Sequence, residues 1–388
     1  MQKVKKGSNI IIASDSFKGC LTSHEVGQAC ADGIERLGRG LQTKIIGISD
    51  GGEGFLECMK YAVGCDIVEI NTFDPLGREI KACYGIKDNT AIIETAQTSG
   101  LGLLGNNKNP LKSTTYGMGI LIKDAVGRGC KRIIVGLGGS ATNDGGMGML
   151  RALGIRFLDS KGRELYGVGS DLSLVKSVNT DYLLDEIKEI EFILATDVEN
   201  PLLGEFGATR VFAPQKGADC SVVEQLEAGM ANYASVCKIA LGKDFSSYAG
   251  TGAAGGLGYA FVAFLGARIC SGIDFMLDAC HFSSLLKHAA LVITGEGRVD
   301  CQTAKGKAPF GVLRAAKSAG VPVVAIGGSI ERNAVAELMD LGFAALFSVS
   351  PGPEKIEDAV KPSRAKENIS IVAAQIVSLF LAAENSCC

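Results

Sequence analysis

The chain has no tryptophan, only three histidines and no pair of cysteines with the Cys-x-x-Cys spacing. His24, His281 and His288 offer little material for a histidine-based nucleophilic relay or a histidine-rich zinc site. The 13 cysteines lie mostly within apolar stretches, so we interpret them as reduced, mostly buried small side chains rather than disulfides or metal ligands. Any chemistry must therefore rely on carboxylates, lysines, hydroxyl groups and glycine loops.

The sequence also lacks a strong charge of either sign, because its formal net charge is only -3. The net charge therefore gives no indication that the protein binds nucleic acid or an anionic membrane. No apolar run approaches the roughly 18 residues of a membrane span, and the first apolar stretch is too short for a signal peptide. We expect a cytoplasmic protein, a monomer or a homodimer, that binds neither nucleic acid nor membrane.

Glycine, by contrast, is abundant, at 51 of 388 residues. The glycines show no fixed period and cluster at the ends of apolar runs, which is typical of turns and of positions where a ligand approaches the backbone. A chain of this length favours two domains over a single core. Thr22 and Glu25 have the spacing of a capping box, which places a helix start directly after the first strand.

The rhythm of strands and helices predicts a discontinuous α/β fold. Two strand–helix units precede residue 66 and three more follow residue 289, so residues 1–66 and 289–388 are expected to form a flavodoxin-like domain with a parallel sheet of order 2-1-3-4-5. Residues 67–288 begin with closely spaced strands, typical of an antiparallel or mixed sheet, and are expected to form an inserted mixed α/β domain. A continuous two-domain split stays an alternative.

Polar residues follow the expected strands of the flavodoxin-like domain. In an open α/β sheet, ligands bind outside the carboxyl ends of the strands, and the order 2-1-3-4-5 brings the first and third loops together. The alternative is that polar residues merely end strands, as they do in any α/β protein. The residues after the first, second and third strands are Asp15, Ser16 and Lys18, then Asp50, and then Glu296, Arg298, Asp300 and Lys307.

The inserted segment contains a second set around the glycine loop Gly136–Gly146, whose spacing is neither that of a dinucleotide-binding loop nor that of a P-loop. Backbone N–H groups of such a loop bind anions without side-chain charge, and Ser140, Thr142 and Asn143 add neutral donors. Asp144 is unsuited to direct contact with phosphate but suits a metal or a hydroxyl group. A tight structural turn is the alternative.

Three further features belong to this set. Asp197 ends another strand, and Lys216 follows it in the stretch PQKG. The glycine-rich stretch Gly250–Gly258 fits close helix packing as well as it fits ligand binding. This inventory of carboxylates, lysines, hydroxyls and glycine loops suits Mg²⁺-dependent phosphoryl transfer.

Five motifs in this order, spread over almost the whole chain, resemble the bacterial glycerate kinase family, type 1. They are ASDSFKGCLTS, SDGGEGF, GLGGSATNDGGMGML, TGAAGGLG and TGEGRVDCQTAKGKAP. The resemblance implies ATP-dependent phosphorylation of D-glycerate to 2-phosphoglycerate or 3-phosphoglycerate in glycerate, glyoxylate or sugar-acid breakdown. It also implies a flavodoxin-like domain that carries an inserted domain of restriction-endonuclease-like topology.

With that reaction in view, the residues receive hypothetical roles. Asp197 is the first choice for the acid that takes the hydroxyl proton and Asp50 the second, with Lys18 as part of the clamp on the glycerate carboxylate. Asp15, Glu296 and Asp300 are expected to hold Mg²⁺. The active site is expected in the cleft between the domains, where closure excludes water. The residues expected to bind substrate or phosphate are Ser16, Gly138, Gly139, Ser140, Thr142, Asn143, Asp144, Lys216, Arg298 and Lys307.

Two other functions stay open at this point. A non-catalytic sensor would close on a small hydroxy acid, although the excess of carboxylates argues against a purely recognising site. A metal-dependent phosphatase would act without nucleotide. Mg²⁺-dependent turnover of ATP separates the kinase from both alternatives.

Overall fold

A computed structural model describes residues 9–386 and divides the chain into two compact units. The first, here called the flavodoxin-like unit, comprises the residues up to Asp50, Glu57–Val63 and the residues from Ile273 onward. The second, the inserted unit, comprises Gly51–Leu56 and Gly64–Gly272. The bounds expected for the folding domains stay a prediction, because compactness alone does not show which segments fold independently.

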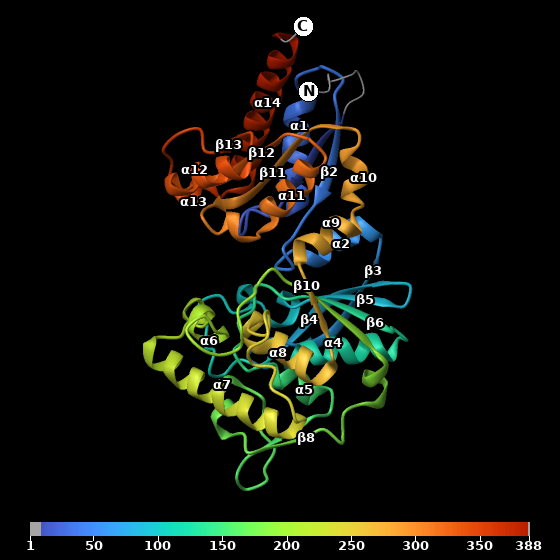
Figure 1. Ribbon diagram of the computed structural model, residues 1–388, viewed down its shortest axis with the longest axis vertical. Helices are drawn as coiled ribbons and strands as arrows, with labels where there is room; N and C mark the ends of the chain where they lie inside the picture. The colour runs from blue at the N-terminus through green and yellow to red at the C-terminus, as the bar shows by residue number, and fades with distance from the viewer. Residues whose placement is uncertain (1–8, 387–388) are drawn as a thin grey trace. The chain divides into compact units, whose positions relative to one another are not determined.

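The flavodoxin-like unit is built on one parallel sheet that joins the two ends of the chain. Its order is β13-β12-β11-β1-β2, and every neighbouring pair is parallel. Strand β1 pairs with β11, which is the orange strand labelled in Figure 1, although about 280 residues separate them along the chain. The predicted order 2-1-3-4-5 is thereby confirmed. The strands are β1 (Asn9–Ser14), β2 (Gln42–Gly47), β11 (Ala289–Val299), β12 (Val323–Ile330) and β13 (Ala345–Ser348).

Helices connect these strands, as the sequence rhythm predicts. The first begins with the predicted capping box, in which the Thr22 hydroxyl accepts from the backbone of Glu25 and the Glu25 carboxylate accepts from the backbone of Thr22. The helices are α1 (Ser23–Glu35), α2 (Phe55–Val63), α9 (Gly272–Ala279), α10 (Phe282–Leu286), α11 (Ala308–Ser318), α12 (Arg332–Leu341), α13 (Ile356–Ala359) and α14 (Pro362–Ser386).

The inserted unit contains a mixed six-stranded sheet of order β10-β9-β6-β5-β4-β3. Strands β3, β4 and β5 pair in an antiparallel manner, whereas β5, β6, β9 and β10 are parallel. The expected mixed α/β architecture is confirmed. The strands are β3 (Asp66–Phe73), β4 (Glu79–Lys87), β5 (Thr90–Glu94), β6 (Arg132–Gly136), β9 (Glu191–Ala195) and β10 (Arg268–Cys270), and a separate two-stranded sheet contains β7 (Arg156–Leu158) and β8 (Ser177–Asn179).

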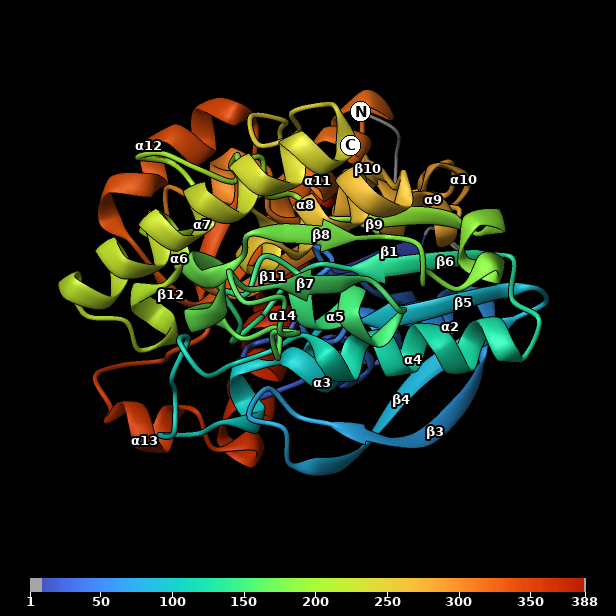
Figure 2. The ribbon, with the colours of Figure 1, turned by 90° about the horizontal axis from the view of Figure 1, so that it is seen from below.

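The core of the inserted unit lies between this sheet and its helices. Helices α4 and α5 pack against each other (Figure 2), and their buried side chains share one apolar cluster with those of α7 and α8. The core fixes the loops at the carboxyl ends of β5, β6 and β9. The helices are α3 (Ala96–Ser99), α4 (Tyr116–Gly127), α5 (Met147–Ala152), α6 (Ala208–Phe212), α7 (Cys220–Leu241) and α8 (Ala253–Leu265).

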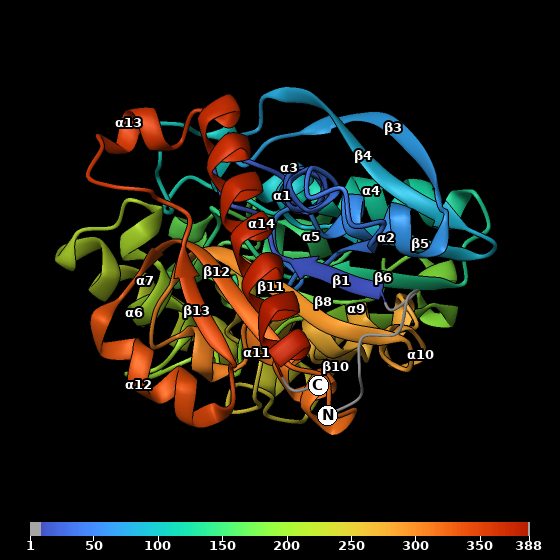
Figure 3. The same cartoon turned by 90° about the horizontal axis from the view of Figure 1, so that it is seen from above.

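Helix α14 is the one element, among residues 9–386, that is long and apolar enough to cross a membrane by length and composition, over Pro362–Ala383. The expectation that no apolar run comes near that length is therefore too strict. However, 44% of the most apolar 18-residue window of this helix is buried within the protein. Figure 3 shows α14 crossing the face of the parallel sheet, and Ser370 lies so close to α1 that only a glycine fits at Gly33. We therefore interpret α14 as a core helix.

The eleven cysteines that the structure describes are free thiols. Five of them are buried, including Cys30 and Cys58, whereas Cys220 is exposed. Burial raises the pKa of the Cys30 thiol to about 12, so this thiol stays protonated and unreactive at neutral pH. Cys387 and Cys388 lie outside the described residues.

Candidate active site

The flavodoxin-like unit brings together carboxylates from three neighbouring strands. Asp15 follows β1, is 5% exposed, and donates its backbone N–H to the Gly295 carbonyl at 2.8 Å. Its pKa is raised to about 8, first by burial and then by the charges of Asp50 and Glu296, while Lys18 acts in the opposite direction. The predicted convergence of the loops after β1, β2 and β11 is therefore present within this unit.

A second network joins the loop after β11 to the start of α11. The Thr303 hydroxyl donates to Oε1 of Glu296 at 2.6 Å, and Nζ of Lys307 donates to Oε2 of Glu296 at 3.3 Å and to Oδ1 of Asp300 at 3.4 Å. Burial raises the pKa of Glu296, whereas Thr303 and Lys307 lower it. The network holds a lysine and two carboxylates within one short segment.

The other predicted residues of this unit lie at its surface or beside Asp15. Arg298 is exposed and pairs with Glu331 and, at 3.7 Å, with Asp300. Lys18 is exposed as well. The hydroxyl of Ser16 is buried and has no hydrogen-bond partner among the described residues, while its backbone N–H donates to Oδ1 of Asp15 at 2.7 Å. To bind substrate, the Arg298 side chain would have to break its ion pair with Glu331.

No three histidine, cysteine or acidic side chains among residues 9–386 converge as a ready-made metal site. Asp15, Glu296 and Asp300 therefore do not form a complete protein cage for a cation. Mg²⁺ is usually held by one or two carboxylates together with substrate phosphates and water, so this arrangement is compatible with a site that the substrate completes.

In the inserted unit, Glu94, the glycine loop and Asp197 follow the adjacent parallel strands β5, β6 and β9. Oε2 of the buried Glu94 accepts from the backbone of Leu56, a residue of the same unit, at 2.9 Å. Close backbone approach explains the glycines here: a side chain at Gly138 would lie 2.3 Å from the Cα atom of Gly52. Gly139 is exposed and has φ +68°.

Asp197 is held by residues that follow β10. Its Oδ1 atom accepts hydrogen bonds from the Ser271 hydroxyl at 2.7 Å and from the Gly272 backbone at 3.0 Å. Asp197 is half-buried. These contacts fix the orientation of the carboxylate that the sequence favours as the base.

Asp144 is held by backbone and side-chain groups of its own unit. It is fully buried, and Oδ2 accepts from the backbone and hydroxyl of Thr115 at 2.8 and 2.7 Å and from Gly148 at 3.1 Å. Oδ1 accepts from Gly146 at 3.1 Å. With both oxygens engaged, Asp144 links the start of α5 to the residue before α4, and its expected part in ligand binding stays a prediction.

Lys216 is the charged group beside the glycine loop. It is 2% exposed, and its Nζ donates to the Ser140 hydroxyl at 2.9 Å and to the Thr142 carbonyl at 2.7 Å. Burial lowers its pKa to about 7, and the charge of Asp144 raises it. Oγ1 of Thr142 and Oδ1 of Asn143 are buried without a hydrogen-bond partner among the described residues.

The second glycine-rich stretch packs against this loop. Residues Ala254–Gly256 have left-handed backbone conformations, and the Gly255 carbonyl accepts from Gly145 at 3.1 Å. A side chain at Gly255 would lie 2.0 Å from the Thr142 carbonyl oxygen. The packing interpretation of this stretch is therefore the one that the contacts support.

Comparison with known proteins identifies the relatives of this chain. The sequence model of the Glycerate kinase family matches residues 10–381. The chain belongs to the glycerate kinase family. Its resemblance to that family, predicted from the five motifs, is confirmed.

Individual glycerate kinases are similar over nearly their full length. The glycerate kinase of Bacillus subtilis strain 168 is 44% identical over 90% of this chain and 92% of its own. The glycerate 2-kinase of Escherichia coli K12 is 39% identical over 94% of this chain and 98% of its own. A crystal structure of a protein assigned as glycerate kinase 2 from Salmonella typhimurium LT2 is 38% identical, with TM-score 0.82, over 98% and 100% of the two chains.

This glycerate kinase family member also contains polar residues near the candidate site that sequence reasoning missed. The buried hydroxyls of Thr95, Thr98 and Ser99 belong to the N-cap and helix of α3, next to the glycine loop, and Ser271 contacts Asp197. The polar run after the strand at Thr90–Glu94 is a signal that could have indicated the first three. Ser271 gives no such signal, because only the pairing of β9 with β10 brings it to Asp197.

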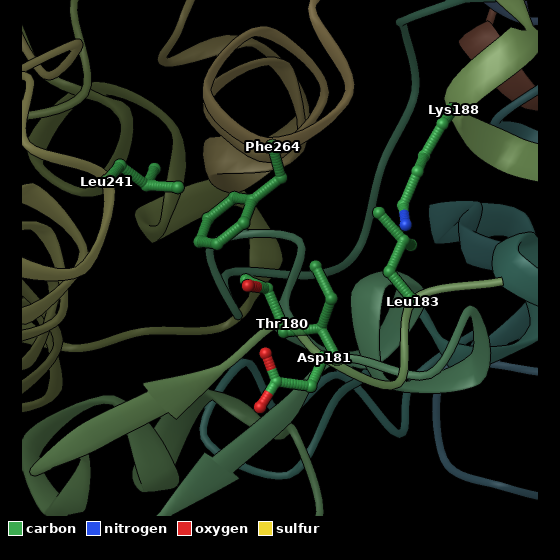
Figure 4. Close-up of a pocket in the computed structure, with 7 residues that line it drawn as sticks. Thr180, Asp181, Leu183, Lys188, Leu241 and Phe264 are labelled. Atoms are coloured by element: carbon green, nitrogen blue, oxygen red, sulfur yellow. The ribbon is translucent and has the colours of Figure 1, made fainter. Parts of the chain in front are cut away.

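A cavity of about 440 Å³ lies elsewhere in the inserted unit. Figure 4 shows its lining, where the Phe264 ring and Leu241 accompany the charged Asp181 and Lys188. None of the residues expected to do chemistry lines it. The cavity therefore does not serve the site described above.

Proposed function

We propose that this chain is a glycerate kinase that transfers the γ-phosphoryl group of ATP to a hydroxyl group of D-glycerate. Family membership supports the reaction, and the network of Asp15, Glu296, Asp300 and Lys307 carries the assignment to residues. Phosphoryl transfer needs charge stabilisation and positioning more than covalent chemistry, and this network offers both cationic and anionic groups. The expected cleft location of the active site and the cytoplasmic location stay predictions.

The acidic groups of the flavodoxin-like unit fit a magnesium ion. The raised pKa of Asp15 reflects burial together with neighbouring negative charges, a situation that a divalent cation relieves. Asp15 and Glu296 would hold the ion, with Asp300 acting directly or through water. When bound, Mg²⁺ supplies neutralisation of the phosphate oxygens. Lys307 is assigned to the phosphate oxygens themselves. Lys18, first expected on the glycerate carboxylate, is reassigned to phosphate because its charge acts on Asp15, one of the proposed Mg²⁺ ligands.

In the proposed reaction, a glycerate hydroxyl oxygen bonds to the γ-phosphorus while the bond from that phosphorus to the β–γ bridging oxygen breaks, and ADP leaves. Asp197 receives the hydroxyl proton, held in orientation by Ser271 and Gly272. Asp50 is the second candidate for this role. The name of the Escherichia coli relative favours 2-phosphoglycerate as the product.

The test is incubation of the purified protein with ATP, Mg²⁺ and D-glycerate, followed by ³¹P NMR. A phosphomonoester that appears together with an equal amount of ADP is the expected result. One proton coupled to phosphorus indicates the 2-phosphate, and two indicate the 3-phosphate. Release of phosphate from organic phosphates without ATP would support a phosphatase instead, and binding of glycerate without turnover would support a sensor.

A matched pair of variants tests the assigned network. Lys307→Ala is expected to lower kcat by on the order of 10²-fold, because a cation that stabilises developing charge is lost. Lys317→Ala is the control, since Lys317 lies in the last turn of α11, the helix that follows Lys307, and its Nζ donates to the Leu341 carbonyl instead. Equal activity of the two variants would remove Lys307 from the proposed site.

A further inference from the structure

Two segments of the inserted unit, Thr95–Ser99 and Ser140–Asn143, are held side by side by backbone contacts. The backbone of Ala141 donates to the Ser99 carbonyl at 2.7 Å, and Gly100 forms an antiparallel bridge with Ser140. Within each segment the backbone is fixed by the core beneath it. Chain positions about 40 residues apart therefore form one buried polar cluster.

This cluster contains several buried side-chain oxygens that have no hydrogen-bond partner among the described residues. Most buried polar groups in proteins have hydrogen-bond partners, so a local group of exceptions needs an explanation. A bound molecule with several polar atoms supplies one. The side chains that carry such an oxygen, among the described residues of the two segments, are Thr95, Thr98, Ser99, Thr142 and Asn143.

Lys216 adds a positive charge to the same buried polar cluster, because its Nζ contacts Ser140 and Thr142. An ammonium group has three N–H donors, and the contacts with Ser140 and Thr142 account for two of them. Both acceptors are neutral, and no ion pair that includes Lys216 occurs among residues 9–386. A buried ammonium without a carboxylate partner is costly, and a bound anion removes that cost.

We propose that Lys216 and these two segments form the subsite for the glycerate molecule, with Lys216 on its carboxylate and Ser99, Thr142 and Asn143 on its hydroxyl groups. The inference rests on the proposed function and names the unit of the chain that holds the hydroxy acid. It also adds Thr95, Thr98 and Ser99 to the site.

The charge balance favours a carboxylate over a nucleotide phosphate at this position. One ammonium group matches the single charge of glycerate, whereas a triphosphate carries several charges and is usually met by several cations. Hydroxyl and amide side chains that donate or accept suit the two hydroxyls of glycerate. Asp144, whose charge acts on Lys216, has both oxygens engaged, and Nζ of the nearby Lys108 donates to the Gln215 carbonyl.

Binding of a carboxylate at Lys216 has a measurable consequence for protons. In the free protein, burial lowers the pKa of Lys216 to about 7, and a carboxylate in contact with the ammonium raises it again. Glycerate binding therefore takes up about half a proton at pH 7 and close to one proton at pH 8, if the pKa in the complex exceeds about 10.

The first experiment is calorimetric titration of the full chain with D-glycerate and Mg²⁺, without nucleotide. Titrations at pH 8 in buffers of different ionisation enthalpy give the number of protons taken up. We expect close to one proton for the natural chain and none for Lys216→Met, which also binds glycerate at least 10-fold more weakly. Proton uptake that follows ATP instead of glycerate would place phosphate at this site and overturn the inference.

A second set of variants separates ligand contact from a structural role. Thr142→Val and Ser99→Ala each remove a hydroxyl that has no partner in the protein, so neither is expected to lower the urea midpoint. Each is expected to raise the KM for glycerate about 3- to 10-fold and to leave the KM for ATP unchanged. Ser370→Ala, which removes an equally buried and unpartnered hydroxyl in the flavodoxin-like unit, is the control and changes neither constant.

The inference and the proposed function fail in different ways. A folded Lys216→Met variant with normal KM for glycerate would refute the subsite and leave the kinase intact. Glycerate binding with proton uptake, but without transfer from ATP, would support the subsite and refute the kinase reaction.

Discussion

The hydroxyl group of Ser271 donates a hydrogen bond to Oδ1 of Asp197 over 2.7 Å. The two residues follow the neighbouring parallel strands β9 and β10 and are 74 positions apart in the chain. A carboxylate that receives a proton must be oriented toward it before the reaction, and this contact restricts the rotation of the Asp197 side chain. Ser271 therefore acts as a positioning residue in the proposed mechanism.

The first prediction concerns this pair. Asp197→Asn keeps the shape of the side chain but cannot take a proton, so kcat is expected to fall about 10²- to 10⁴-fold. Ser271→Ala leaves the carboxylate in place and is expected to lower kcat only about 10-fold, with kcat restored by Ser271→Thr. Steady-state kinetics with ADP detection provide the measurement. Near-normal turnover of Asp197→Asn would transfer the role to Asp50.

The second prediction separates structure from chemistry at Asp144. The carboxylate of Asp144 accepts hydrogen bonds from Thr115, Gly146 and Gly148 through both of its oxygens. Asp144→Asn replaces one of these oxygens by an NH₂ group, which donates instead of accepting. The free energy of unfolding is expected to fall by about 3 kcal/mol, because buried backbone N–H groups lose a charged acceptor. Urea denaturation measures the change. Asp185→Asn is the control, since Asp185 is 90% exposed and pairs with Lys188 at the surface, and a change within about 0.5 kcal/mol is expected.

The architecture of the flavodoxin-like unit was predictable because its signals are local. Each strand is a short buried run such as that of Asn9–Ser14, followed by a helix with an apolar face, and parallel strands joined in this way allow few arrangements. The mixed character of the inserted sheet was predictable from the close spacing of the strands between Asp66 and Glu94. Helix α14 was underestimated, because charged residues interrupt its apolar positions without preventing burial of one face.

Candidate site residues were predictable only where their place in the sequence, directly after a strand of a parallel sheet, already indicates a ligand-binding position. Residues that directly follow strands, such as Asp15 after β1 and Asp197 after β9, come from a rule about parallel sheets. The role of Asp144 was not predictable, because the sequence does not reveal whether Thr115 and the α5 backbone already occupy its oxygens. Ser99 escaped notice for a related reason, since its neighbourhood depends on the bridge between Gly100 and Ser140.

The third prediction tests the packing of the second glycine-rich stretch against the first. Gly255→Ala combines a left-handed backbone, φ +67°, with a methyl group 2.0 Å from the Thr142 carbonyl. It is expected to lower the free energy of unfolding by about 3 kcal/mol or more. Gly266→Ala is the matched control, because φ is +63° there and nothing lies within 4 Å, so a loss of about 1 kcal/mol is expected.

Gly255→Ala and Gly266→Ala are also expected to differ in their KM for glycerate. The Thr142 carbonyl accepts the hydrogen bond of Lys216, so a displaced Thr142 is expected to raise the KM for glycerate in Gly255→Ala at least 10-fold. Gly266→Ala is expected to keep the natural KM. Equal stability losses in the two variants would mean that the loop yields and that the contact at Gly255 is not a constraint.

The fourth prediction follows from the burial of Lys216. Its pKa is lowered from 10.5 to about 7 in the folded chain, so between these values the unfolded chain holds a proton that the folded chain lacks. Stability conferred by the neutral lysine is therefore complete above pH 10.5 and is lost as the pH falls toward 7. The free energy of unfolding of the natural chain, measured against that of Lys216→Met, is expected to rise by about 1 kcal/mol per pH unit across this window.

Urea denaturation of both proteins at pH 7, 8 and 9 measures this difference, and the comparison cancels the titration of other groups that the two chains share. A saturating concentration of glycerate is expected to remove the slope, because a bound carboxylate keeps Lys216 protonated in the folded state as well. A slope that persists under saturation would mean that the ligand does not contact Lys216. A difference independent of pH in the free protein would mean that Lys216 stays charged in the folded chain, which requires a counter-charge near it that the contacts of its ammonium group do not supply.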